Sequence, residues 1–230
     1  MAQNALDTAL QMQKAGADIL DIGGQSTRPG HIPITADEEW QRLSGPLSLI
    51  LKGVNIPVSV DTFYPEVAEK ALKMGAHIIN DVSGTVNPKM AAVVKKYGAG
   101  LVLMHSGEEN TEDIVTTVNA KLVAMLNTAV ELGVPSANIC LDAGIGFGKT
   151  NDQSFNLIKN TAQVKVNGNA YLLGASRKRV VAAFMGDDNI PANKRDEGTV
   201  TLHLMGVKGG ADIIRVHNVP LAVDSLKNIN

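Results

Sequence analysis

"MQKAGADILDIGG", residues 12–24, joins the end of a helix to a buried strand and decides the fold. Its first half has helical periodicity and stops at Gly16, since a glycine near a helix end can take the left-handed C-cap conformation. The apolar run that follows shows no regular alternation with polar residues. Strands buried on both faces have this pattern, and they belong to parallel sheets covered by helices. The stretch therefore predicts a helix followed by a buried parallel strand.

The same succession of helix, glycine and strand recurs along the chain. The other copies are LKGVNIPVSVDT (51–62), LKMGAHIINDVSG (72–84), VKKYGAGLVLMH (94–105), ELGVPSANICLDAG (131–144) and VKGGADIIRVHN (207–218). With NAYLLGAS (169–176) they predict seven strands, near residues 18–23, 57–61, 77–82, 100–104, 138–142, 170–174 and 212–216. Repeats of about 30 residues favour parallel strands in a closed barrel over an open sheet. We predict an α/β fold, a (β/α)8 TIM barrel, in one domain over residues 1–230.

A (β/α)8 barrel has eight strands, and the first of them has no counterpart in this sequence. The sequence begins directly on a predicted helix, NALDTALQMQKAG (4–16). A barrel that lacks one strand leaves two strand edges unpaired. We expect these edges to be covered by another chain, by a rearranged helix or by a strand swapped from a partner.

Composition excludes several classes of protein. Apolar residues make up 44% of the chain, charged residues 19%, and the net charge is −2, which argues against disorder, nucleic-acid binding and a basic membrane patch. The N-terminal residues lack the apolar core of a signal peptide, and no stretch of about 20 apolar residues is present, so we expect a cytoplasmic protein. The single cysteine, Cys140, is predicted to be a buried apolar side chain. Small molecules are the expected partners.

Polar residues follow each predicted strand, where the active sites of such barrels lie. They are Asp21, Ser26, Thr27 and Arg28; Asp61 and Thr62; Asn80 and Asp81; His105; Asp142; Ser176, Arg177 and Lys178; and Arg215, His217 and Asn218. Each has a structural explanation when taken alone. Asp61 and Thr62 could cap a helix near Pro65, and Asp142 could be a solvated loop acid. Polar groups after all seven strands predict a site.

The two sides of this rim differ in charge. Acids and an amide follow the earlier strands, whereas cations follow the last two, where such barrels often bind phosphate. The acids and amide are Asp61, Asn80 and Asp142, and the cations are Lys178, Arg215 and His217. A nitrogen heterocycle that bears a phosphate or pyrophosphate would satisfy both sides.

The segment AGIGFGKT (143–150) nearly matches a phosphate-binding loop, with Ala143 in place of the first glycine. A nucleotide hydrolase would require an open sheet and would leave the other polar strand ends unexplained. We interpret the segment as a loop that covers a flat ligand with Phe147 and leaves Lys149 solvated.

Several of these motifs occur together in one known family. They are DIGGQSTRPG (21–30), SVDT (59–62), IINDVSG (78–84), LMH (103–105), DAGIGFGK (142–149), GASRKR (174–179) and IIRVHNV (213–219). In this order and spacing the sequence resembles the dihydropteroate synthase family over essentially its whole length. The resemblance implies a (β/α)8 barrel, usually a homodimer formed through its last helices. It also implies condensation of 6-hydroxymethyl-7,8-dihydropterin pyrophosphate with p-aminobenzoate, giving 7,8-dihydropteroate and pyrophosphate.

The same resemblance implies the roles of individual residues. Asp61, Asn80, Asp142 and Lys178 would hold the pterin ring, and Arg215 with His217 would bind the pyrophosphate, so the expected catalytic residues are Asp61, Lys178, Arg215 and His217. Thr27 and Arg28 would lie in a loop that closes near the aminobenzoate, against which Phe147 and the Lys178 stem would pack. Mg²⁺ is the expected cofactor, because it would help the pyrophosphate to leave.

The sequence also departs from the family pattern. The usual opening strand and loop, of the type N-V-T-P-D-S-F, supplies an asparagine to the metal and has no counterpart here, so no metal ligand is assigned. Gln25 stands where the family more often has glutamate or another residue, and Ala143 stands where proline is usual. Three hypotheses stay open: a working synthase, a truncated or non-catalytic pterin binder, and a pterin-dependent methyltransferase. The pyrophosphate-suited SRKR and RVHN motifs argue against the last.

Overall fold

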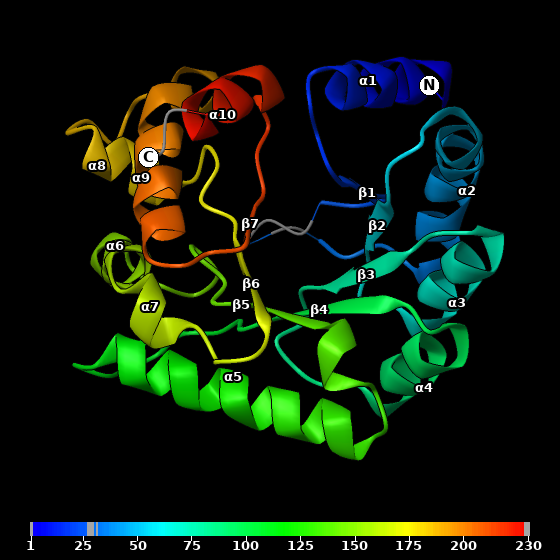
Figure 1. The fold of residues 1–230 in the computed structure, drawn as a ribbon, viewed down its shortest axis with the longest axis horizontal. Coiled ribbons are helices and arrows are strands. Elements are labelled where there is room, and N and C mark those ends of the chain that lie inside the picture. Colours follow the sequence, from blue (N-terminus) through cyan, green and yellow to red (C-terminus); the bar gives the residue numbers. More distant parts are fainter. Residues whose placement is uncertain (1, 27–29, 31, 228–230) are drawn as a thin grey trace.

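Seven parallel strands form an open barrel surrounded by helices (Figure 1). The structure, a computed structural model, describes residues 2–26, 30 and 32–227. The strands are β1 (Leu20–Gly23), β2 (Val58–Asp61), β3 (Ile78–Asp81), β4 (Gly100–Met104), β5 (Ile139–Asp142), β6 (Ala170–Leu173) and β7 (Ile213–Ile214). Each strand pairs with the next in sequence. The predicted α/β barrel and its seven strands are confirmed.

The helices lie outside the ring of strands and begin and end where local sequence dictates. They are α1 (Ala2–Lys14), α2 (Ala36–Gly53), α3 (Pro65–Met74), α4 (Pro88–Tyr97), α5 (Ile114–Glu131), α6 (Asn151–Lys159), α7 (Thr161–Val164), α8 (Arg179–Phe184), α9 (Asp196–Lys208) and α10 (Val219–Leu226). Thr35 and Glu38 form a capping box that starts α2. α3 ends as predicted, at a left-handed glycine, Gly75 with φ 114°. Its N-cap is Tyr64, so Asp61 and Thr62 do not cap it.

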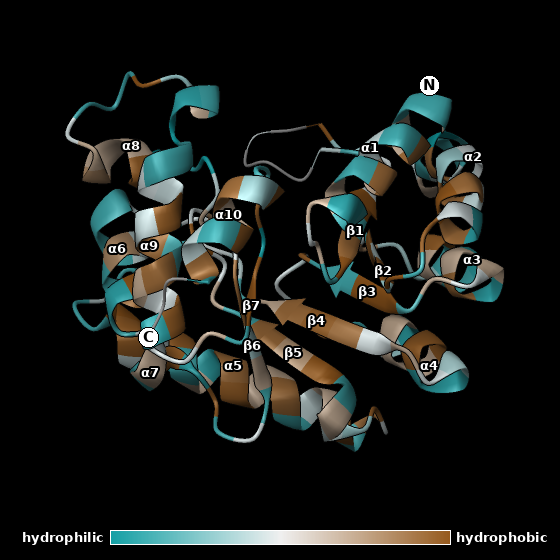
Figure 2. Cartoon of the chain, turned by 45° about the horizontal axis from the view of Figure 1, so that its top comes forward, coloured by the Kyte–Doolittle hydropathy of each residue, from teal (hydrophilic) through white to brown (hydrophobic). Residues whose placement is uncertain are grey.

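The apolar core has two parts because alternate residues of each strand face the helices and the barrel interior. The larger part lies between strands and helices and includes Leu47, Leu101 and Tyr171. The smaller part, formed by Val102, Cys140 and Leu172, lies inside the ring. In Figure 2 the strands β4 and β5 are hydrophobic along most of their length, whereas the helices also carry hydrophilic stretches. Cys140 is buried as predicted, and burial raises the pKa of its thiol to about 12.

The opening lies between β1 and β7, each of which has one strand neighbour within the described part of the chain. β2 and β5 are buried throughout, but β7 is only partly buried. β7 spans two residues instead of the predicted 212–216, and β1 begins at Leu20 instead of residue 18. A strand paired on one side only lacks half of the ladder that would extend it, which accounts for both differences.

Two contacts join the sides of this opening. Arg215, just after β7, places its Nε 2.7 Å from Oδ2 of Asp21 in β1. Outside the ring, α10 packs beside the end of α1. A Cβ added to Gly16, which follows α1, would lie only 3.2 Å from Cγ2 of Val223 in α10. The sides are thus tied by an ion pair and a helix contact. Covering by another chain or a swapped strand stays a prediction.

Candidate active site

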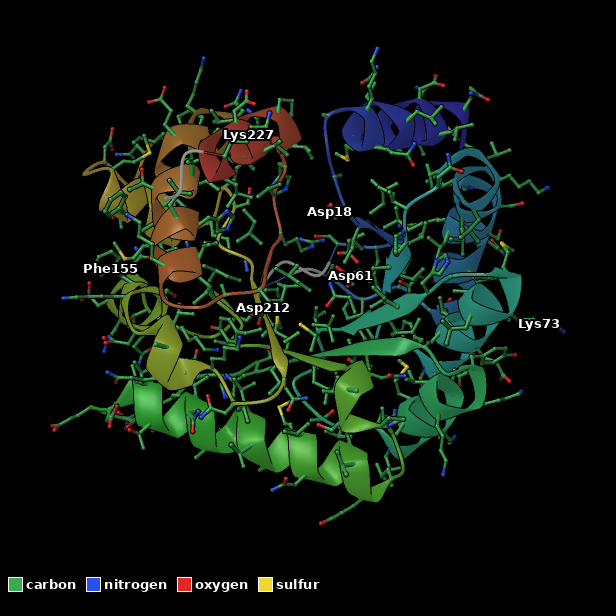
Figure 3. The ribbon with its side chains drawn as sticks, in the orientation of Figure 1. Asp18, Asp61, Lys73, Phe155, Asp212 and Lys227 are labelled. Atoms are coloured by element: carbon green, nitrogen blue, oxygen red, sulfur yellow. The ribbon has the colours of Figure 1, made fainter. Side chains whose placement is uncertain are left out.

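Three predicted site residues lie inside the ring, at the carboxyl ends of their strands. Asp61 of β2 pairs in register with Asn80 of β3, and Asp142 of β5 pairs with Met104 of β4. Asp61, Asn80 and Asp142 are each less than a tenth exposed. Figure 3 shows Asp61 in the middle of the ring, whereas Lys73 lies at the periphery. The structure therefore brings these three polar residues together, as predicted.

Asp21 connects the two halves of the site, and the sequence alone assigns it no individual role. Its Oδ2 accepts hydrogen bonds from Arg215 Nε (2.7 Å) and Asn80 Nδ2 (3.2 Å). Nη2 of Arg215 also lies 3.6 Å from Oδ2 of Asp61. Partial burial disfavours the guanidinium charge, although 44% of the Arg215 side chain is exposed, but the carboxylates of Asp21 and Asp61 outweigh this effect and raise the pKa of Arg215. Arg215 is thus held charged between strands far apart in sequence.

Asp142, Lys178 and Phe147 form a second group. Oδ1 of Asp142 accepts the Gly144 N–H at 2.7 Å, and burial raises the pKa of its carboxyl although Lys178 opposes the change. Nζ of Lys178 donates to the Ile145 carbonyl at 2.6 Å and lies 4.7 Å from the centre of the Phe147 ring. Burial lowers the pKa of Lys178 to about 8, although Asp142 stabilises its charge. Asp142 is therefore a buried acid beside a cation, and its interpretation as a solvated loop acid is wrong.

The prediction of a solvated Lys149 is also wrong. Lys149 is only 5% exposed, and its Nζ donates to the carbonyls of Phe147 (3.0 Å) and His105 (3.3 Å). Gly144 has φ 67°, and a Cβ there would lie 1.8 Å from the His105 carbonyl oxygen, so the loop packs directly on its neighbour. The segment 143–150 is therefore not a phosphate-binding loop, because its lysine donates to backbone carbonyls and because it lies on a barrel instead of an open sheet.

The turns after β6 and β7 meet at Ser176 and His217. Ser176 Oγ lies 2.8 Å from Nδ1 of His217 and accepts the His217 backbone N–H at 3.3 Å. Both residues are thereby placed on the cationic side of the rim with Arg215. Thr27 and Arg28, with Pro29 and His31 of the same loop, lie outside the described residues.

Glu39 of α2 was not predicted to contribute, although it is fully buried beside the site. Its Oε2 accepts the Thr62 hydroxyl at 2.9 Å, and burial raises the pKa of its carboxyl against that hydrogen bond. A Cβ on Gly24 would lie 2.7 Å from the Glu39 carbonyl oxygen. Glu39 therefore joins the turn after β2, at Thr62, to the start of the loop after β1, at Gly24. In the sequence it looks like one of the exposed acids of a helix's first turn.

The described residues do not form a magnesium site by themselves. Nowhere in the ranges 2–26, 30 and 32–227 do three His, Cys, Asp or Glu side chains gather in a way that could hold a metal ion. The asparagine loop that the resemblance implies as a metal ligand also has no counterpart in the sequence. Mg²⁺ stays a prediction. Among the helices described, none is long and apolar enough to cross a membrane.

The barrel and its rim define an enzyme of the pterin-binding class, and the model of the family "Pterin binding enzyme" matches residues 1–217. Dihydropteroate synthase of Clostridium beijerinckii is 39% identical over 224 residues, 94% of this chain and 82% of that protein. The chain therefore belongs to the dihydropteroate synthase family of transferases.

Solved structures agree with this assignment. The enzyme of Clostridium difficile, solved in the presence of pteroic acid, superposes with a TM-score of 0.93 at 35% identity, over 98% of this chain and 86% of that one. The enzyme of Xanthomonas albilineans, solved with 4-aminobenzoic acid, gives a TM-score of 0.94 at 33% identity, over 98% and 83% of the two chains.

Proposed function

We propose that this chain condenses 6-hydroxymethyl-7,8-dihydropterin pyrophosphate with p-aminobenzoate to give 7,8-dihydropteroate and pyrophosphate. The observation that carries the proposal is the division of one rim into an acid and amide side and a cationic side, joined through Asp21 and Arg215. The ligands named for the two solved relatives, pteroic acid and 4-aminobenzoic acid, support it.

We assign the pterin ring to Asp61, Asn80, Asp142 and Lys178. Carboxylates accept hydrogen bonds from N–H groups of a heterocycle. Asn80 donates one amide N–H to Asp21, so its second N–H and its carbonyl oxygen are the groups that it offers to a ligand. Lys178 is mostly protonated at neutral pH, since burial lowers its pKa only to about 8, and it supplies a donor. Hydrogen bonds in such a buried site are stronger than in water.

We assign departure of the pyrophosphate to Arg215 and His217. The bond between the methylene carbon and the pyrophosphate oxygen breaks, and the pyrophosphate leaves with the electron pair. Cations stabilise this developing negative charge. Asp61 and Asp142 favour the positive charge that develops on the pterin methylene. The amine nitrogen of p-aminobenzoate forms the new bond to that carbon and loses a proton to the released pyrophosphate, so no serine or cysteine nucleophile is required.

The aminobenzoate is assigned to the side of the rim where Nζ of Lys178 lies 4.7 Å from the centre of the Phe147 ring. Apolar side chains around the ring of the ligand would exclude water from the reacting atoms. The contributions of Thr27 and Arg28 stay predictions.

Further parts of the proposal rest on the resemblance to the family. We propose one domain over residues 1–230, a homodimer formed through the last helices, and a cytoplasmic enzyme. Light scattering during size-exclusion chromatography tests the dimer, because a monomeric mass at assay concentration contradicts it.

The function is tested by measuring dihydropteroate formation from both substrates with Mg²⁺. We expect turnover by the wild type, a loss of about 10²-fold in Lys178→Ala, and little change in Lys73→Ala, an exposed lysine of α3. Pterin binding without turnover by the folded wild type would contradict the synthase and identify a non-catalytic pterin binder. A requirement for a corrinoid partner would identify a methyltransferase.

A further inference from the structure

The turn after β6 holds a residue in a strained backbone conformation. Arg177 has φ 59°, and no other non-glycine residue has a positive φ in the part of the chain that the structure describes. L-residues with a long side chain disfavour this left-handed region. Arg177 lies between Ser176 and Lys178, which both belong to the candidate site. Strain maintained at such a position requires surrounding contacts that hold it.

Those contacts come from the start of α9. The Arg177 N–H donates to Thr199 Oγ1 at 3.1 Å, and Nη1 of Arg195 donates to the Arg177 carbonyl at 3.0 Å. Nε and Nη2 of Arg177 donate to the two carboxylate oxygens of Asp196 at 2.7 and 2.8 Å. This paired hydrogen bonding raises the pKa of Arg177 and lowers that of Asp196. Every hydrogen-bonding group of the Arg177 backbone is therefore satisfied by α9 and the residue that precedes it.

Asp196 also reaches the turn after β7. Its Oδ2 accepts the Asn218 side-chain amide at 3.0 Å, and Asn218 directly follows His217. His217 is joined in turn to Ser176 at 2.8 Å. One carboxylate thus ties together the two turns that carry the cationic side of the rim.

We infer that Arg177 and Asp196 are positioning residues for the pyrophosphate half of the site. Their ion pair keeps residue 177 left-handed, and this backbone conformation sets the directions of Ser176 and Lys178 on either side of it. Through Asn218, the same carboxylate fixes the turn of His217. The inference rests on the proposed function, because it assigns these two residues to the departure of pyrophosphate.

A glycine at position 177 separates backbone conformation from side-chain chemistry. Arg177→Gly can stay left-handed without the ion pair and keeps its N–H and carbonyl contacts, whereas Arg177→Ala loses the ion pair and disfavours the conformation. We expect kcat/KM for the pterin pyrophosphate to fall by about tenfold or more in Arg177→Ala and by less than about threefold in Arg177→Gly. The inhibition constant of inorganic pyrophosphate should rise in parallel. Overall destabilisation of an enzyme that stays folded would not raise this constant. Equal losses in both variants would overturn the inference, since the guanidinium itself would then be required. Wild-type behaviour of Arg177→Ala would overturn it too.

The carboxylate is tested with Asp196→Asn in both backgrounds. Because the glycine removes the need for the ion pair, we expect Asp196→Asn to cost at least about threefold less in Arg177→Gly than in the wild type. Fully additive effects would contradict the coupling. Calorimetric measurement of inorganic pyrophosphate binding distinguishes failure of the proposed synthase function from failure of the positioning role. A wild type that binds pyrophosphate more tightly than Arg177→Ala but makes no dihydropteroate refutes the synthase and supports the positioning role. A wild type without pyrophosphate binding refutes that role.

Discussion

Replacement of Lys149 by methionine tests whether burial of the charged ammonium group opposes folding. Lys149 is 5% exposed and contacts two backbone carbonyls, and burial lowers its pKa to about 8 from an ordinary value of 10.5. Methionine has a similar length and volume but no charge. Lys149→Met therefore removes the titrating group with little change in packing.

The sign of the pH effect follows from proton binding. Below pH 8 the side chain is charged in both the folded and the unfolded state, and burial of the charge opposes folding. Between about pH 8 and 10.5 the folded protein has released the proton while the unfolded chain retains it, so stability rises with pH. The difference between the two pKa values corresponds to roughly 3 kcal/mol. The wild type should gain about that much unfolding free energy relative to Lys149→Met across this range.

Urea unfolding from pH 7 to 10.5 measures this difference directly. Comparing the two proteins at each pH cancels the titration of those shared groups that do not interact with Lys149. Lys73→Met, at an exposed position of α3, is the matched control and should show a difference from the wild type that stays constant with pH. A constant difference for Lys149→Met as well would refute the argument, because Lys149 would then keep its proton in the folded protein.

Three further predictions concern the strand opening, the loop after β5 and the metal. Asp21→Asn removes the carboxylate that pairs with Arg215. Because the Arg215 side chain is 44% exposed, we expect the unfolding free energy in urea to fall by only about 1–2 kcal/mol, together with a lower kcat/KM. Unchanged values would contradict a role for this pair. Gly144→Ala forces a Cβ within 1.8 Å of the His105 carbonyl oxygen, whereas at Gly168, with φ 90°, an added Cβ meets no atom within 4 Å. The Tm of Gly144→Ala should therefore fall well below that of Gly168→Ala. Equal Tm values would show that the loop moves freely. Removal of Mg²⁺ by a chelator should reduce turnover until Mg²⁺ is restored, and a turnover rate that chelation leaves unchanged would exclude the predicted metal.

Local sequence determined the number of strands and the side of the barrel that carries the site. A glycine stop followed by an apolar run marks each strand, because helix capping and burial depend on residues close together in the chain. The side chains after the strands were also predictable, since parallel strands place all their carboxyl ends at one rim. Asp61, Asn80 and Asp142 were found together for this reason.

The tertiary structure alone decided which of these polar groups pair. Asp21 and Arg215 are separated by 194 residues along the chain, and Arg177, in the turn after β6, reaches Asp196 at the start of α9. Lys149 and Glu39 look solvated in the sequence, yet both are buried by neighbouring segments. Sequence periodicity records which face of an element is apolar, but hydrogen bonds and burial depend on distances between elements, and these exist only when the barrel has assembled.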